Sequence, residues 1–195
     1  MPNYLHFKVA VKGIEPPIER EFLLHEQATF EDLHRAIQDA GGWQDHQFYI
    51  FFPEKMVGHI AHKDDRNVHD NLPGPIGANV ALRSYFRDAK GAAAPVRRCI
   101  YQYGAGNSGW LVDVVMVEKV ESAGRFERRL SGGARAFPPE DCGGMSGYFK
   151  CAGMVRIADV AADPDWVDSN GLLDWLDGWH PDRFDPASVY ENFNR

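Results

Sequence analysis

Hydrophobic and polar residues alternate at the start of the chain. This period of two predicts a half-buried strand over residues 4–11. A second strand is predicted over residues 18–24, directly after two prolines that place its start at a sheet edge or a bend. The hydrophobic side chains that share one side of the first strand are Leu5, Phe7, Val9 and Val11.

The spacing changes to a helical one after Thr29. Thr29 and Asp32 have the spacing of a capping box, which marks a helix start. Gly41 and Gly42 mark its end. The hydrophobic positions between them fall on one helical face, and they are Phe30, Leu33, Ala36, Ile37 and Ala40.

The middle of the chain predicts further strands and one long loop. The polar stretch 60–75 is expected to be the loop. Valine is abundant in 110–120, which gives the clearest strand pattern of the chain. The segments expected to form strands are 47–52, 80–86, 99–103 and 110–120.

The last third changes to loops and helices. Residues 125–147 are rich in glycine and arginine and are expected to be a loop region. Helix signals follow at Asp163-Pro164, at the apolar group within 172–176, and at Asp185-Pro186. Since strands and helices do not alternate regularly, the order β-β-α-β, more strands and then helices predicts an α+β fold with a mainly antiparallel sheet.

This pattern fits one compact domain over residues 1–195. Its parts are a β-β-α-β half (1–90), a central strand pair (96–122), and a segment of loops and C-terminal helices (123–195). A chain of 195 residues that is 44% hydrophobic can bury a core of this size.

Charge and cysteine content narrow the function classes. The net charge is −7, which weakens the case for general nucleic-acid binding. The three cysteines form no Cys-x-x-Cys pair, which favours a reducing compartment. Without a signal peptide or an apolar run of about 18 residues, we expect a cytoplasmic protein with no membrane partner.

Imidazoles and carboxylates gather over residues 59–70, and one further histidine, His46, lies upstream. Such groups suit a divalent metal, although their spacing matches no standard zinc pattern and loops of this kind are usually solvated. No cofactor is therefore expected, with a divalent metal as the alternative. The candidate ligands are His46, His59, His62, Asp64 and His69.

Two further motifs have simpler structural interpretations. Residues 104–109 match the glycine pattern of a dinucleotide site, but a strand-like segment follows where a helix is required, so a hairpin turn is favoured. Cys142 stands beside Glu140 and Asp141, whose charges disfavour a thiolate, so it is not expected to be a nucleophile. No catalytic residue is predicted.

The basic residues concentrate after the central strand pair. Guanidinium groups can bind phosphate, but neighbouring glutamates favour a self-neutralised surface. The candidate nucleic-acid contacts are Arg125, Arg128, Arg129 and Arg135.

Several segments together resemble the plasmid pRiA4b ORF-3-like family. They are Pro16-Pro17-Ile18, the helix segment 29–38 with Gly42-Trp43, the strand pair 101–119, and the C-terminal motifs near 163, 173 and 184. The most specific one is a loop similar to the family's Cys-Pro-Pro-Glu-Asp-Cys-Gly-Gly…Gly-Tyr signature. We call residues 137–144 the signature loop; with Tyr148, its matching residues are Pro138, Pro139, Glu140, Asp141, Cys142, Gly143 and Gly144.

The chain departs from the family at several polar positions. Glu19-Arg20-Glu21 stands in place of Trp-Arg-Arg, Phe48 in place of a histidine, and Phe137 in place of the first cysteine. The family's Asp-Phe-Gly-Asp…Trp-x-His stretch reads Gln102-Tyr103-Gly104-Ala105…Trp110-x-Val112. Apolar groups cannot coordinate a cation, so these changes favour binding over catalysis.

The resemblance implies a compact α+β domain carried by plasmids and mobile elements. Our leading hypothesis is a non-enzymatic binding or interaction module in a mobile-element or host-defence context, with another protein as partner. In it, Glu140 and Asp141 brace their loop through backbone amides. The alternatives are a metal-dependent enzyme acting on nucleic acid, and a nucleic-acid-binding protein without catalysis.

Overall fold

The structure is a computed structural model of the 195-residue chain. It describes residues 1–54, 59–61, 76–87, 95–161, 168 and 170–194. The described residues form one sheet of eight strands in the order β5-β4-β3-β6-β7-β1-β2-β8. Every neighbouring pair is antiparallel except β4 and β5. The predicted α+β class and the β-β-α-β start are confirmed.

The strands at the centre of the sheet follow the predicted pattern closely. The alternating segments form β1 (Asn3–Val11), β2 (Glu19–His25), β3 (Tyr49–Pro53), β6 (Arg98–Tyr103) and β7 (Trp110–Glu121). Residues 104–109 form the turn between β6 and β7, with a short 3₁₀ helix, η1 (Gly106–Ser108), inside it. The hairpin interpretation of this glycine-rich segment is therefore correct.

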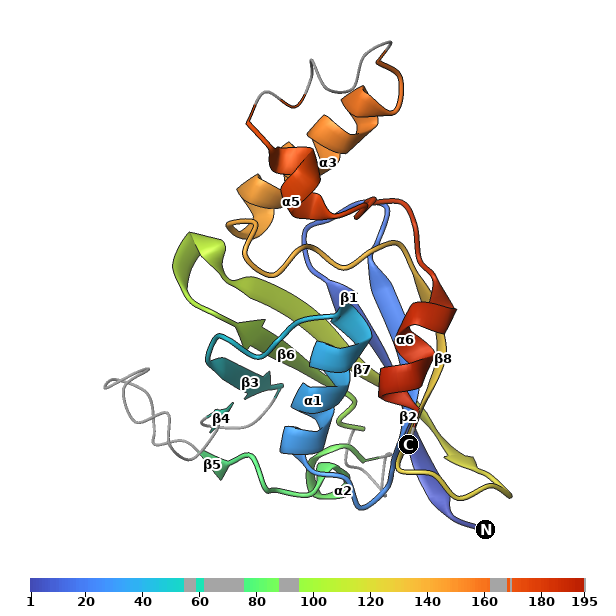
Figure 1. The fold of residues 1–195 in the computed structure, drawn as a ribbon. Helices are drawn as coiled ribbons and strands as arrows, with labels where there is room; N and C mark the ends of the chain where they lie inside the picture. The colour runs from blue at the N-terminus through green and yellow to red at the C-terminus, as the bar shows by residue number, and fades with distance from the viewer. Residues whose placement is uncertain (55–58, 62–75, 88–94, 162–167, 169, 195) are drawn as a thin grey trace.

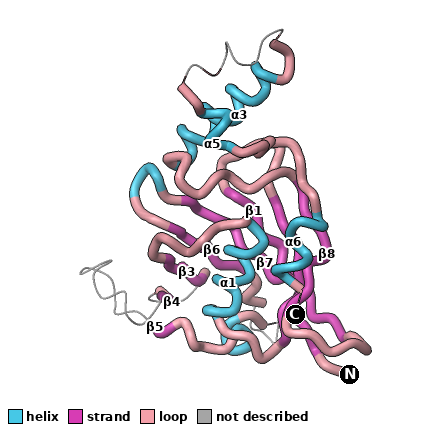
Figure 2. Tube along the Cα trace, viewed as in Figure 1, coloured by secondary structure: helices cyan, strands magenta, loops and turns pink. Residues whose placement is uncertain are grey.

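Helix α1 (Phe30–Gly41) covers one face of the sheet. Thr29 caps it with a complete capping box, and Gly42 ends it in the left-handed conformation. Its hydrophobic face packs on the inward residues of the strands to form the core. Helix α6 (Pro186–Phe193), capped by Asp185 as predicted, lies on the same face beside α1 (Figures 1 and 2).

The other helices lie beyond one end of the sheet. Helix α3 (Gly144–Ala158) begins within the signature loop, and α5 (Leu172–Leu176) packs against it (Figure 1). No helix was predicted for the segment that forms α3, which contains Gly144, Gly147 and Gly153. The predicted helix start at Asp163-Pro164 lies outside the described residues. No described helix is long and apolar enough to cross a membrane.

Three predicted segments need correction. Residues 80–86 form no strand. Instead, α2 (Leu82–Tyr85) buries Leu82 and Tyr85, and backbone hydrogen bonds connect this segment to the residues around the start of α1. The loop expected from 60 begins with strand β4 (Ile60–Ala61), which pairs with β3 and with β5 (Ile76–Gly77). The expected loop at 125–147 contains β8 (Arg128–Ala134), because pairing with β2 fixes it as an edge strand.

Candidate functional site

The signature loop meets two other loops at the end of the sheet where β6 turns into β7. Glu140 connects them: its carboxylate accepts hydrogen bonds from the Gln44 amide at 2.6 Å, the His46 amide at 3.2 Å and the Tyr103 hydroxyl. The loop after α1, strand β6 and the signature loop are thus held together by one side chain. The hypothesis that Glu140 and Asp141 brace their own loop needs correction: Glu140 accepts from amides of the loop after α1, and no hydrogen bond of the Asp141 carboxylate occurs among the described residues.

Tryptophan side chains tie the same loops together. The Trp43 indole N–H donates to the Pro138 carbonyl at 2.9 Å, and the Trp179 indole N–H donates to the Phe137 carbonyl at 2.8 Å. Trp43 also stacks on Tyr103, with ring centroids 5.1 Å apart. The conformation of the signature loop is therefore fixed from both sides.

The two glycines of the signature loop have left-handed backbones, with φ of 89° at Gly143 and 71° at Gly144. Gly144 also lies directly against the turn between β6 and β7, where a Cβ atom would be 2.9 Å from Ser108 Cα. A side chain at this position would separate the signature loop from that turn.

Cys142 has no feature of a nucleophile. It packs partly buried against the core, and its thiol faces the Gly144 carbonyl at 3.6 Å. Burial first, and then the nearby Cys151, raise the pKa of the Cys142 thiol to about 12. At neutral pH the group is a protonated thiol.

This protonation state predicts slow alkylation. At pH 8 we expect Cys142 in the native protein to react with iodoacetamide at least about 100-fold more slowly than in the urea-unfolded chain, because the thiolate is the reacting form. Peptide mass spectrometry over a time course measures both rates. Equal rates would show an accessible thiolate at this position.

A buried polar network supports the loop after α1. His34 is only 2% exposed; its Nδ1 lies 2.8 Å from the Tyr101 hydroxyl and its Nε2 lies 3.0 Å from Asp45 Oδ1. Gln38 donates to the same hydroxyl and accepts from the Asp45 amide. Because every polar group here has a partner inside the protein, the network stabilises the loop and leaves no free base.

His34 gives the fold a pH dependence. Burial is the main cause that lowers the pKa of His34, and Asp45 opposes it only in part. Below about pH 6.5 the unfolded chain takes up a proton that the native state resists, so stability falls with decreasing pH by up to about 1.4 kcal/mol per unit from this group.

The measurement is urea unfolding at pH 7, 6 and 5. We expect His34→Gln to be less stable than the wild type at pH 7 but to lose less stability between pH 7 and pH 5. The same loss in both proteins would assign the pH dependence to other groups.

The predicted metal ligands do not come together in the described part of the chain. His46 is exposed and contributes its backbone amide to Glu140, whereas His59 is 5% exposed beside Phe52. His62, Asp64 and His69 lie outside the described residues. No group of three metal-ligating side chains occurs among the residues described.

The predicted basic cluster is divided by the fold. Arg128 is buried, pairs with Asp39 and donates to the Phe193 carbonyl at 2.8 Å, so it anchors α6. Arg135 pairs with Asp182 at 2.9 Å and donates to Tyr148 and Pro16. These two guanidinium groups are committed inside the protein, while Arg125 and Arg129 are exposed.

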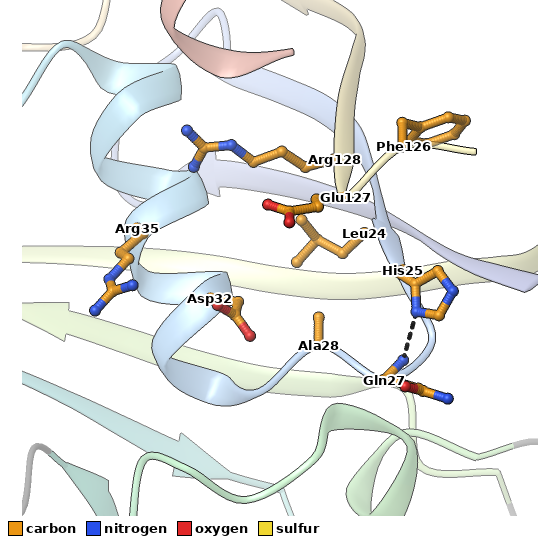
Figure 3. Close-up of a pocket in the computed structure, with 9 residues that line it drawn as sticks. All are labelled: Leu24, His25, Gln27, Ala28, Asp32, Arg35, Phe126, Glu127 and Arg128. Carbon is orange, nitrogen blue, oxygen red and sulfur yellow. Dashed lines mark hydrogen bonds between the residues drawn. The ribbon is translucent and has the colours of Figure 1, made fainter. Parts of the chain in front are cut away.

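A hollow of about 350 Å³ lies between the start of α1 and the paired strands β2 and β8 (Figure 3). Its polar groups are mostly committed to the fold. The Asp32 carboxylate accepts from the Thr29 amide in the capping box, Arg35 pairs with Glu31, and His25 accepts a hydrogen bond from the Gln27 amide. This hollow therefore offers a ligand few free groups.

Two other hollows lie on either side of the turn between β6 and β7, and both are lined by Trp110. We call the smaller one, of about 240 Å³, the signature pocket; it is lined by Gln47, Tyr103, Gly104, Ser108, Trp110, Glu140, Asp141 and Gly143. The larger one, the apolar groove, is lined by Lys12, Gly13, Asn107, Gly109, Trp110, Leu111, Met145, Ser146 and Phe149.

The apolar groove exposes large hydrophobic side chains at its rim. Leu111 is 44% and Phe149 53% exposed. Neither Trp110 nor Phe149 was predicted from the sequence to be a functional residue. The position of Trp110 directly after a glycine-rich turn was the available signal.

These features define an α+β sheet protein whose loops form a braced surface pocket at one end of the sheet. The chain belongs to the family described as plasmid pRiA4b ORF-3-like protein, which matches residues 3–188. The solved structure of MM3350 from Methanosarcina mazei Go1, described as a protein of unknown function, is similar to the structure of this chain. The two share 26% sequence identity over 97% of each chain, with a TM-score of 0.77. No curated protein matches this chain significantly.

Two departures from the family pattern have a structural explanation. Phe137 is 3% exposed and contacts Trp43 with ring centroids 5.2 Å apart, while Val112 is fully buried. Both apolar side chains therefore pack in the core, at positions where the family pattern has a cysteine and a histidine.

Proposed function

We propose that this protein is a non-enzymatic binding module that engages another protein through the signature pocket and the apolar groove. The plasmid in the family's name supports a mobile-element context for it. The observation that carries the proposal is that two hollows, both of which touch Trp110, lie beside the turn between β6 and β7, and that the larger one exposes Leu111 and Phe149.

The chemistry of this surface supports binding over catalysis. The Cys142 thiol is protonated, and Glu140 already accepts three hydrogen bonds. Exposed Leu111 and Phe149 provide the apolar contact area typical of the centre of a protein interface.

Site-specific photo-crosslinking tests this proposal. A benzophenone amino acid at exposed Ser108, which lines the signature pocket and lies between Asn107 and Gly109 of the apolar groove, is expected to form a discrete adduct in the cells that naturally produce the protein. Exposed Arg83 in α2, near the opposite end of β6, is the matched control position and should form no such adduct.

The adduct should be destroyed by protease and unaffected by nuclease. A nuclease-sensitive adduct would identify nucleic acid as the partner instead. The same adducts from Ser108 and Arg83, or none from Ser108, would contradict the proposal.

A further inference from the structure

An apolar stripe runs along α3 on the side that faces away from α5. Cys151 and Val155 of α3 pack with Leu176 of α5, so they mark the covered side of the helix. Side chains three or four positions apart share one helical face, which places a second hydrophobic set on the opposite side. We call this set the α3 stripe; it consists of Phe149, Gly153, Ile157 and Val160, the last in the turn after α3.

The α3 stripe exposes enough apolar surface for an interface. Phe149 is 53%, Ile157 55% and Val160 85% exposed. These fractions correspond to roughly 350 Å² of hydrophobic side chain, a patch of the size that marks interaction sites on monomeric proteins. Two such stripes packed together would bury roughly 700 Å², and their flanking side chains would bring the total near the roughly 1,000 Å² of a small specific interface.

Gly153 forms a notch in the middle of the α3 stripe. No described atom lies within 4 Å of the place where its Cβ atom would be, and its φ is not positive. A glycine inside a helix costs stability relative to alanine, and no contact described within this chain requires one here. The close approach of a second helix would account for it.

A second copy of α3 fits this notch when it runs antiparallel about a two-fold axis. In the register that places Ile157 of each copy over Gly153 of the other, Phe149 of one copy lies opposite Val160 of the other. The large side chains then meet either the notch or another apolar side chain. Every contact occurs twice, so one stripe supplies both halves of the interface.

The charges beside the α3 stripe do not oppose this pairing. Its four members are uncharged, and Lys150 and Arg156 lie on its two flanks. Arg156 is neutralised by Asp182 at 3.0 Å. In the antiparallel register the two Lys150 side chains start about 15 Å apart along the helices, beyond the screening length of about 8 Å at physiological salt.

We propose that the protein forms a weak two-fold symmetric dimer through the α3 stripe, with Ile157 of each copy packed over Gly153 of the other. The inference goes beyond the proposed function, since the α3 stripe meets the apolar groove only at Phe149. The two Phe149 positions lie at opposite ends of the helix pair, about 18 Å apart along it. The dimer therefore presents two apolar grooves to a partner.

Sedimentation equilibrium of the whole chain tests the inference. Between about 10 and about 500 µM, we expect the average mass to rise from that of one chain toward that of two. A dissociation constant of about 100 µM is expected, because interfaces near the lower size limit are weak and transient.

Gly153→Leu is the decisive variant. Leucine meets no described atom within the chain and has a higher helix propensity than glycine, so the single chain should be at least as stable in urea unfolding. It fills the notch that Ile157 of the other copy needs, so the dissociation constant should rise at least about ten-fold. Unspecific association would instead become tighter, because the variant exposes more apolar surface.

Two glutamate variants locate the interface. Ile157→Glu would bury an unpaired carboxylate at the two-fold axis, so it should leave a single-chain mass up to about 500 µM. Val117→Glu on β7 is the matched control, since Val117 is 37% exposed and lies outside the α3 stripe. It should dimerise like the wild type.

The inference would be overturned by a single-chain mass over the whole concentration range, by unchanged or tighter association in Gly153→Leu, or by equal masses of the two glutamate variants. The proposed function is judged separately by the adduct at Ser108. A nuclease-resistant adduct from a protein that stays a single chain would retain the binding module and reject the dimer.

Discussion

Replacing Arg20 by methionine is expected to destabilise the protein by about 3–5 kcal/mol. Arg20 is 3% exposed, and among the described residues it pairs with no carboxylate. Its guanidinium donates to the carbonyls of Ala40, Glu19, Ala134 and Arg135 at 2.7–3.2 Å. Methionine would leave buried acceptors of α1 and β8 unpaired.

Arg20 also lies between two aromatic rings. Its guanidinium carbon is 4.8 Å from the Phe137 ring centroid and 4.0 Å from that of Phe184. Phe137 begins the signature loop, so the variant would also loosen that loop. Burial alone lowers the pKa of Arg20 to about 10, which leaves the group charged at neutral pH.

Urea unfolding at pH 7 measures the effect, with Arg129→Met as the matched control. Arg129 is exposed on β8 and contacts only the Phe126 ring, at 4.0 Å, among the contacts described for it, so its loss should change stability by less than about 1 kcal/mol. Arg20→Lys should fall between the two, since an ammonium cannot reach all four carbonyls. Similar values for both methionine variants would mean that the carbonyls find other donors.

The fold was predictable where local periodicity and burial agree. The strands that became β1, β2, β6 and β7 are covered on one face, so the alternation of their residues is visible in the sequence. Helix α1 carries its own cap and stop signals.

The errors occur where tertiary contacts decide the structure. Residues 80–86 contain good strand formers, yet Leu82, Tyr85 and Phe86 have the i, i+3, i+4 spacing that buries them as a short helix. Strand β8 contains Ser131, Gly132 and Gly133, which have low strand propensity, and only its pairing with β2 fixes it.

The candidate site was predictable only in part. The signature loop was recognisable, but its contacts are long-range: Glu140 meets the Gln44 and His46 amides from more than 90 positions away. The buried role of Arg20 could have been found, because Arg20 alternates in phase with Ile18, Phe22 and Leu24. A charged residue on the hydrophobic side of a strand indicates a buried polar contact.

Gly144→Ala is expected to destabilise the protein by about 3–5 kcal/mol, and Gly143→Ala by only about 1–2 kcal/mol. Both positions have positive φ, so both variants carry the backbone penalty of a left-handed alanine. They differ in surroundings: a Cβ at Gly143 meets nothing within 4 Å, whereas one at Gly144 overlaps the Asn107 carbonyl oxygen and lies 2.9 Å from Ser108 Cα.

The two variants differ mainly in what the added Cβ atom meets, so comparing them tests the contact between the signature loop and the turn from β6 to β7. Urea unfolding gives the stabilities, and the NMR signal of the Trp110 indole N–H reports whether the turn has moved. At a temperature where both variants are folded, Gly144→Ala should shift that signal, while Gly143→Ala should leave it in place. Equal stabilities, or an unmoved Trp110 signal in Gly144→Ala, would show that this contact does not shape the signature pocket.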